Sequence, residues 1–65
     1  MDQQEIAARL SALIEEHRDL DAAIEALSGQ PSADQLQIQR LKKRKLRLRD
    51  EIGLLQDMLV PDIIA

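Results

Sequence analysis

The feature that most constrains this chain is a regular three-and-four spacing of apolar residues along its second half. The positions are Ile38, Leu41, Leu48, Ile52, Leu55 and Leu59, and Lys45 fills the one gap in the series. Because an α-helix turns once in about 3.6 residues, positions spaced in this way lie on one face of the helix. Such a heptad seam is typical of coiled-coil packing and predicts a long helix that lies against another helix.

The first half of the chain carries a matching seam. Its positions are Ile6, Leu10, Leu13, His17, Leu20, Ile24 and Leu27. Asp2 followed by Glu5 has the form of a capping box, which predicts that the first helix begins near residue 3. Gly29 predicts its end, since glycine takes the left-handed conformation that closes many helices. We therefore expect a first helix over about 3–28.

A short linker separates the two seams. Pro31 disfavours helical geometry at Gln30, and Ser32 with Gln35 offers a second capping box. We expect a turn over 29–32 and a second helix over about 33–59, which Pro61 ends and a tail over 60–65 follows. A connection this short makes neighbouring helices antiparallel. The predicted fold is all-α, an antiparallel two-helix hairpin that forms one domain over 1–65.

The two seams agree in register, because pairing residues whose numbers add to 65 matches every seam position with another. This register pairs, for example, His17 with Leu48 and Leu20 with Lys45. The residues up to 28 carry a net charge of −5 and those from 36 to 51 a net charge of +5. The flanking ion pairs that we expect are Asp21 with Lys42, Glu16 with Arg44, and Arg9 with Glu51.

Composition limits the classes of function. The chain has 65 residues, no cysteine and no aromatic residue. No apolar run reaches the roughly 18 residues that cross a bilayer, and the acidic N-terminus is unlike a signal peptide, so we expect a soluble cytoplasmic protein without a membrane contact. We find no catalytic triad, phosphate loop or dinucleotide motif. We therefore expect no enzyme activity, no catalytic residue and no bound cofactor.

A chain this short buries a small share of its surface, so one hairpin leaves apolar area uncovered. We expect hairpins to pair into a four-helix bundle, as a homodimer or a higher homo-oligomer. The residues expected at that interface are Leu46, Gly53, Leu54 and Val60. Two isoleucines of the tail, Ile63 and Ile64, either pack against a neighbouring hairpin or form a short motif for a partner.

Two polar residues interrupt the seams. His17, with Asp21 one turn away, supplies too few ligands for a metal site, so we expect a partly buried histidine that is hydrogen-bonded to Asp21 or to the second helix. A role in pH sensing is the alternative. Lys45 is expected to extend its ammonium to solvent and to specify register, because a hairpin offers no pocket for a catalytic lysine. We group His17, Asp21 and Lys45 as a polar seam.

The second helix also carries a cluster of bases. These are Arg40, Lys42, Lys43, Arg44, Arg47 and Arg49, which we call the basic face. Three interpretations are open: a solvated face compensated by the acidic first helix, a docking surface for an acidic protein, and a contact for nucleic acid. The lack of aromatic residues and the net charge of −3 argue against nucleic acid.

Two segments together resemble a known family. They are Glu16-His17-Arg18-Asp19-Leu20-Asp21 with Ile24 and Leu27, and Leu41-Lys42-Lys43-Arg44-Lys45-Leu46 with Arg49-Asp50-Glu51-Ile52. The chain resembles, over about residues 10–56, the YdcH-like family of small bacterial proteins, a domain of unknown function. Arg49 stands where that pattern more often has lysine. The resemblance implies a bacterial cytoplasmic helical hairpin without an assigned activity, in which His17, Asp21 and Lys45 belong together.

These observations favour a small structural or protein-interaction module that self-associates and has no enzymatic role. The alternative is a nucleic-acid-associated accessory factor that uses the basic face. Charge complementarity between the two halves favours the first, whereas basic side chains that stay free of ion pairs would favour the second.

Overall fold

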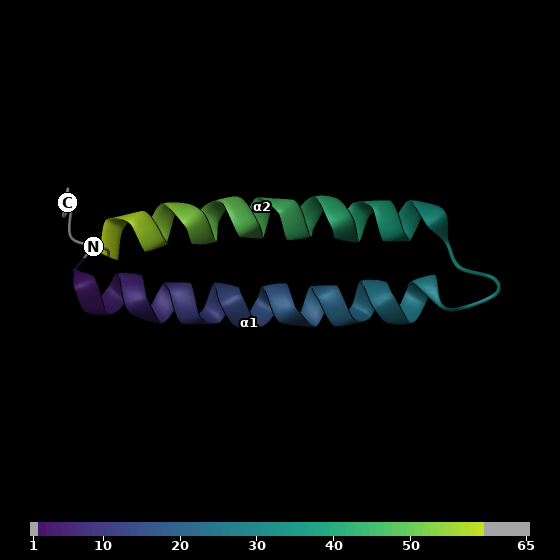
Figure 1. The fold of residues 1–65 in the computed structure, drawn as a ribbon, viewed down its shortest axis with the longest axis horizontal. Coiled ribbons are helices and arrows are strands. Elements are labelled where there is room, and N and C mark those ends of the chain that lie inside the picture. The colour runs from purple at the N-terminus through teal and green to yellow at the C-terminus, as the bar shows by residue number, and fades with distance from the viewer. Residues whose placement is uncertain (1, 60–65) are drawn as a thin grey trace, which may run out of the picture.

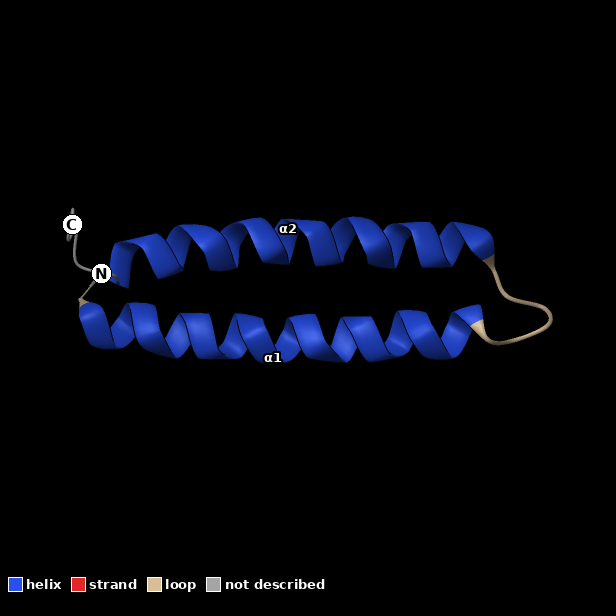
Figure 2. Ribbon diagram, viewed as in Figure 1, coloured by secondary structure: helices blue, strands red, loops and turns tan. Residues whose placement is uncertain are grey.

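The protein is a hairpin of two long helices. The computed structural model describes residues 2–59, and within them α1 spans Gln3–Ser28 and α2 spans Gln35–Leu59. The helices lie side by side and run antiparallel, and one loop joins them at the end away from the start of α1 and the end of α2 (Figure 1). Apart from this loop, nearly all of the described chain is helical (Figure 2). The molecule measures 49 × 23 × 15 Å, and the predicted all-α antiparallel hairpin is confirmed.

The start of α1 follows its sequence signal. The Asp2 side chain accepts a hydrogen bond from the Glu5 backbone N–H at 2.8 Å, and the Asp2 carbonyl accepts from the Ile6 N–H at 3.0 Å. An acidic side chain at this position satisfies an N–H group that has no partner inside the helix, and its charge is favourable beside the positive end of the helix dipole.

The end of α1 differs from the prediction. Gly29 has φ −81° and ψ −6°, which is right-handed, so the expected left-handed cap is wrong. Instead, the Gly29 N–H donates to the Glu25 carbonyl at 3.3 Å, and the Gln30 N–H donates to the Leu27 carbonyl at 3.2 Å. The second bond spans three residues and tightens the last turn, and Pro31 then prevents further helix.

Helix α2 begins at Gln35, two residues later than predicted, because Asp34 rather than Ser32 caps it. The Asp34 carboxylate accepts from the Leu36 and Gln37 backbone N–H groups at 3.0 and 3.3 Å. The Ile38 N–H donates to the Asp34 carbonyl at 3.1 Å, which makes this the first bond of the helix. The loop therefore covers 29–34 instead of 29–32.

The core is a single layer between the helices. Every seam position of both helices is buried or half-buried. Ile6, Leu13, Leu48 and Leu55 form one buried cluster, against which Leu10, Leu20, Ile52 and Leu59 pack. Ile24 and Ile38 are buried nearer the loop and lie outside that cluster. These contacts follow the predicted seams, and they leave the outer faces of both helices uncovered.

Candidate functional site

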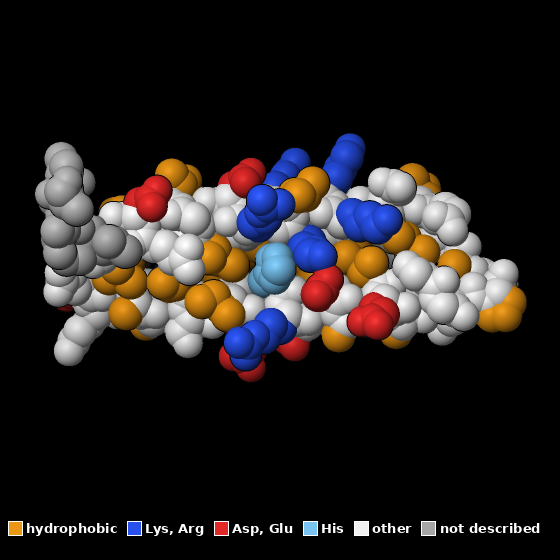
Figure 3. Space-filling model, viewed as in Figure 1, with side chains coloured by type: hydrophobic (Ala, Val, Ile, Leu, Met, Phe, Trp, Pro, Cys, Tyr) orange, Lys and Arg blue, Asp and Glu red, His pale blue; other side chains and the backbone are white. Residues whose placement is uncertain are grey.

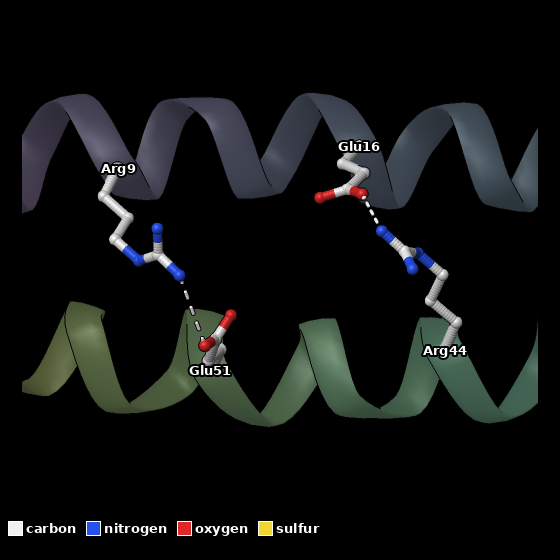
Figure 4. A network of polar contacts seen from close by, with 4 residues as sticks. All are labelled: Arg9, Glu16, Arg44 and Glu51. Atoms are coloured by element: carbon white, nitrogen blue, oxygen red, sulfur yellow. Dashed lines mark hydrogen bonds and ion pairs between the residues drawn. The ribbon is translucent and has the colours of Figure 1, made fainter.

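Two ion pairs lie along one edge of the helix interface. The guanidinium of Arg44 lies 2.6 Å from the Glu16 carboxylate, and that of Arg9 lies 3.5 Å from Glu51. Figure 4 shows both pairs bridging α1 and α2. Both were expected from the register and are confirmed. Since all four side chains are well exposed, each pair adds about 0–1 kcal/mol and mainly favours this alignment of the helices.

The third ion pair lies on the other edge. At about 100° per residue, Asp21 stands across the α1 seam from Arg9 and Glu16. Its carboxylate accepts a hydrogen bond from Lys45 Nζ at 2.6 Å, so the expected pairing with Lys42 is wrong. Lys45 starts inside the seam and its side chain is 34% exposed. Its flexible stem therefore lies along the apolar interface, and its ammonium emerges beside Asp21.

This contact changes the ionisation of Asp21. The hydrogen bond from Lys45 lowers the pKa of the Asp21 carboxyl below its usual value, and the positive charge of Lys45 acts in the same direction. His17 adds a smaller effect of the same sign. The three polar-seam residues are therefore electrostatically linked, with Lys45 as the main partner of Asp21.

His17 is half-buried at its seam position. Within residues 2–59 its side chain makes no hydrogen bond to Asp21 or to α2, and Asp21 Oδ1 accepts from Lys45. The expected histidine hydrogen bond is therefore wrong. Nor do three or more histidine, aspartate or glutamate side chains of the described chain gather closely enough to hold a metal ion.

A groove runs beside the polar seam on this edge. It has a volume of about 270 Å³ and is lined by His17, Ile24, Lys42, Lys45, Leu46 and Arg49. Figure 3 shows this face of the molecule, where lysine and arginine side chains gather over the middle of α2 and apolar side chains are visible between the helices. The groove joins two residues of the polar seam to part of the basic face, with apolar side chains among them.

The basic face is compensated at only one of its six residues. Arg44 pairs with Glu16, whereas no ion pair to any residue of 2–59 forms at Arg40, Lys42, Lys43, Arg47 or Arg49. Of the three open interpretations, compensation by the acidic first helix therefore holds for Arg44 and for no other base of this face within residues 2–59. The physical reason is the helical turn: successive bases point around α2 in different directions, while α1 lies along only one side of it.

The expected oligomer interface divides between two directions on α2. Leu46 and Gly53 are seven residues apart and share one direction, whereas Leu54 points about 80° away from Leu46. Sequence reasoning missed Leu36 and Met58, which lie near the direction of Leu54 and could have been found from their helical spacing. Among residues 2–59, the exposed large apolar residues are Leu36 at 61%, Leu46 at 55%, Leu54 at 66% and Met58 at 58%. Val60 and the isoleucines of the tail lie outside the described residues.

Neither α1 nor α2 contains a stretch that is both long and apolar enough to span a bilayer.

Comparison with curated proteins and with solved structures finds no match to this chain. A family model described as "Protein of unknown function (DUF465)" matches residues 10–56, which include most of both helices and the whole loop. The chain therefore belongs to the DUF465 family of proteins of unknown function.

Proposed function

We propose that this protein is a non-enzymatic structural or interaction module whose hairpins self-associate into a helical bundle. The observation that carries the proposal is that large apolar side chains, Leu46 among them, are exposed on a helix whose other side forms the core. Full burial of such a side chain stabilises by about 1.5–3 kcal/mol. A second hairpin would supply the burial that a single-layer core does not.

The shape of the hairpin supports the same proposal. Eight of the fourteen seam residues are only half-buried, so the seam remains partly open to solvent. In four-helix bundles, two hairpins cover each other's open edges and form a common core. We propose that assembly of this kind occurs in the bacterial cytoplasm, which the resemblance to the YdcH-like family supports.

Sedimentation equilibrium on the full chain tests self-association. We expect a dimer or a larger assembly at tens of micromolar, and a melting temperature that rises with protein concentration because association stabilises the folded state. A chain that remains monomeric at this concentration, with full helicity and a melting temperature independent of concentration, would contradict the proposal.

A second candidate function is that of a nucleic-acid-associated accessory factor. It is favoured by the five bases of the basic face that make no ion pair within residues 2–59. Filter binding to duplex and single-stranded DNA and RNA at low salt tests it. Binding through phosphates should weaken steeply as salt is added, because each contact releases counterions. An absence of binding at low salt would eliminate this candidate.

A further inference from the structure

We infer that the second copy of the chain docks on the side of α2 that carries Leu46 and Gly53, next to the groove at His17 and Lys45. We call this surface the Leu46–Gly53 face. The inference rests on the proposed self-association and specifies which surface makes it. This docking surface is different from the second exposed apolar surface of α2, the stripe formed by Leu36, Leu54 and Met58.

Gly53 is the first observation. Glycine is a much poorer helix former than alanine, so its presence in the interior of α2 needs a reason. The backbone supplies none, because no residue of 2–59 has a positive φ. The packing of the hairpin supplies none either, since a Cβ built on Gly53 would meet no atom within 4 Å. What a glycine permits at such a site is the close approach of a backbone from outside the hairpin.

Leu46 and the groove are the second observation. Leu46 stands two helical turns before Gly53 on the same side of α2, and it lines the groove together with Ile24 and His17. The face therefore offers a projecting leucine, an apolar hollow and a position without a side chain. Helices pack by placing side chains of one into hollows of the other, and this face contains both parts.

Charge identifies the occupant as another copy of this chain. Apart from the three ion pairs within residues 2–59, the carboxylates that remain on α1 are Glu5, Glu15, Asp19 and Glu25, against the single base Arg18. On α2 the two bases that line the groove, Lys42 and Arg49, likewise make no ion pair within residues 2–59. In a two-fold dimer with α1 of each copy against α2 of the other, this complementarity is used twice.

The stripe of Leu36, Leu54 and Met58 is less suited to close packing. It contains no glycine, and Arg40, Lys43 and Arg47 lie along it between Leu36 and Leu54. These bases have no ion-pair partner among residues 2–59, so covering the stripe would require each of them to lose water or to find a new partner. Lys42 and Arg49, by comparison, border the groove at its rim.

A matched pair of substitutions tests the inference. Leu46→Glu and Leu54→Glu make the same change at two exposed leucines of one helix, so neither should unfold the hairpin. Sedimentation equilibrium should show association weakened by about tenfold or more for Leu46→Glu, because a carboxylate would enter the interface, and nearly unchanged for Leu54→Glu. Circular dichroism should show the same helicity for both variants.

The remaining outcomes are distinct. A larger loss for Leu54→Glu, equal losses for both, or no loss for either would overturn the choice of face while leaving self-association intact. A monomeric unmodified chain would overturn the proposed function itself. As a second test, Gly53→Ala should weaken association although it improves helix propensity. Unchanged or tighter association of Gly53→Ala would also overturn the inference.

Discussion

The ammonium of Lys45 lies 2.6 Å from the carboxylate of Asp21, although Lys45 starts in the seam and Asp21 lies on the flank of the other helix. The lysine therefore spans the apolar interface and the solvent-facing edge with one side chain. An apolar residue at position 45 could fill the seam, but it could not form an ion pair with one specific residue of α1. This pair thus couples packing to register, as polar seam residues do in coiled coils.

The pair predicts a defined pH dependence. The folded-state pKa of Asp21 is lowered, so its stabilising contribution is present above its unfolded pKa of about 3.9 and is lost as the pH falls through the lower folded value. We expect Asp21→Asn to lower the melting temperature at pH 7 and to have little effect below the folded pKa. Asp19→Asn, at an exposed position of α1 without an ion pair to residues 2–59, is the control and should change the melting temperature less at pH 7. Equal effects of Asp21→Asn at both pH values would contradict the prediction.

Replacing the lysine separates stability from specificity. Lys45→Leu should raise the melting temperature, because it continues the apolar seam between Leu41 and Leu48 and exchanges an exposed ion pair for buried area. We expect the same variant to populate more than one oligomeric state, since it loses the ion pair with Asp21 that favours one alignment of the helices over others. Thermal melts and sedimentation velocity measure the two effects. A variant that is more stable and still forms one species would show that Lys45 does not specify register.

The helices and their pairing could be predicted from sequence because many residues support each of them. Two seams run through three heptads, so the loss of one position to His17 or Lys45 does not hide the period. The ion-pair partner of Asp21 was harder to predict, because Lys42 and Lys45 lie one turn apart on the same helix and either could reach it. Exposed pairs differ by less than about 1 kcal/mol, and the outcome depends on where a side chain leaves the interface, which a linear pattern does not show.

The side-chain contacts of the candidate site could likewise be predicted only in part from the sequence. Total charge predicted that the acidic and basic halves would face each other, and two of three expected ion pairs form. The number of bases that α1 can reach depends on the width of its contact with α2, and among residues 2–59 Arg44 is the only member of the basic face that forms an ion pair with α1. Leu36 and Met58 were missed although their helical spacing places them on the side of α2 away from the seam, where exposure is expected.

The single-layer core predicts a strong contrast between seam and surface. Leu13→Ala should cost about 2–5 kcal/mol in urea denaturation, because Leu13 lies in the buried cluster with Leu48 and Leu55. Leu36→Ala removes the same atoms from a largely exposed position and should cost about 0.5 kcal/mol or less. Both must be compared at one protein concentration. Similar costs for the two variants would mean that Leu36 is covered in solution, which would favour the stripe of Leu36, Leu54 and Met58 as an interface.

The start of α2 provides the last prediction, because two residues with suitable side chains compete to cap it. The Asp34 carboxylate holds the N–H groups of Leu36 and Gln37, so Asp34→Ala should destabilise the hairpin by about 1 kcal/mol. Ser32 lies three residues before Gln35, the first residue of α2, and accepts neither bond, so Ser32→Ala should leave the free energy of unfolding nearly unchanged. Urea denaturation of both variants, with helicity followed by circular dichroism, measures the difference. A larger loss for Ser32→Ala would place the cap at Ser32 and extend α2 towards the loop, and it would also shorten the connection that turns the chain back on itself.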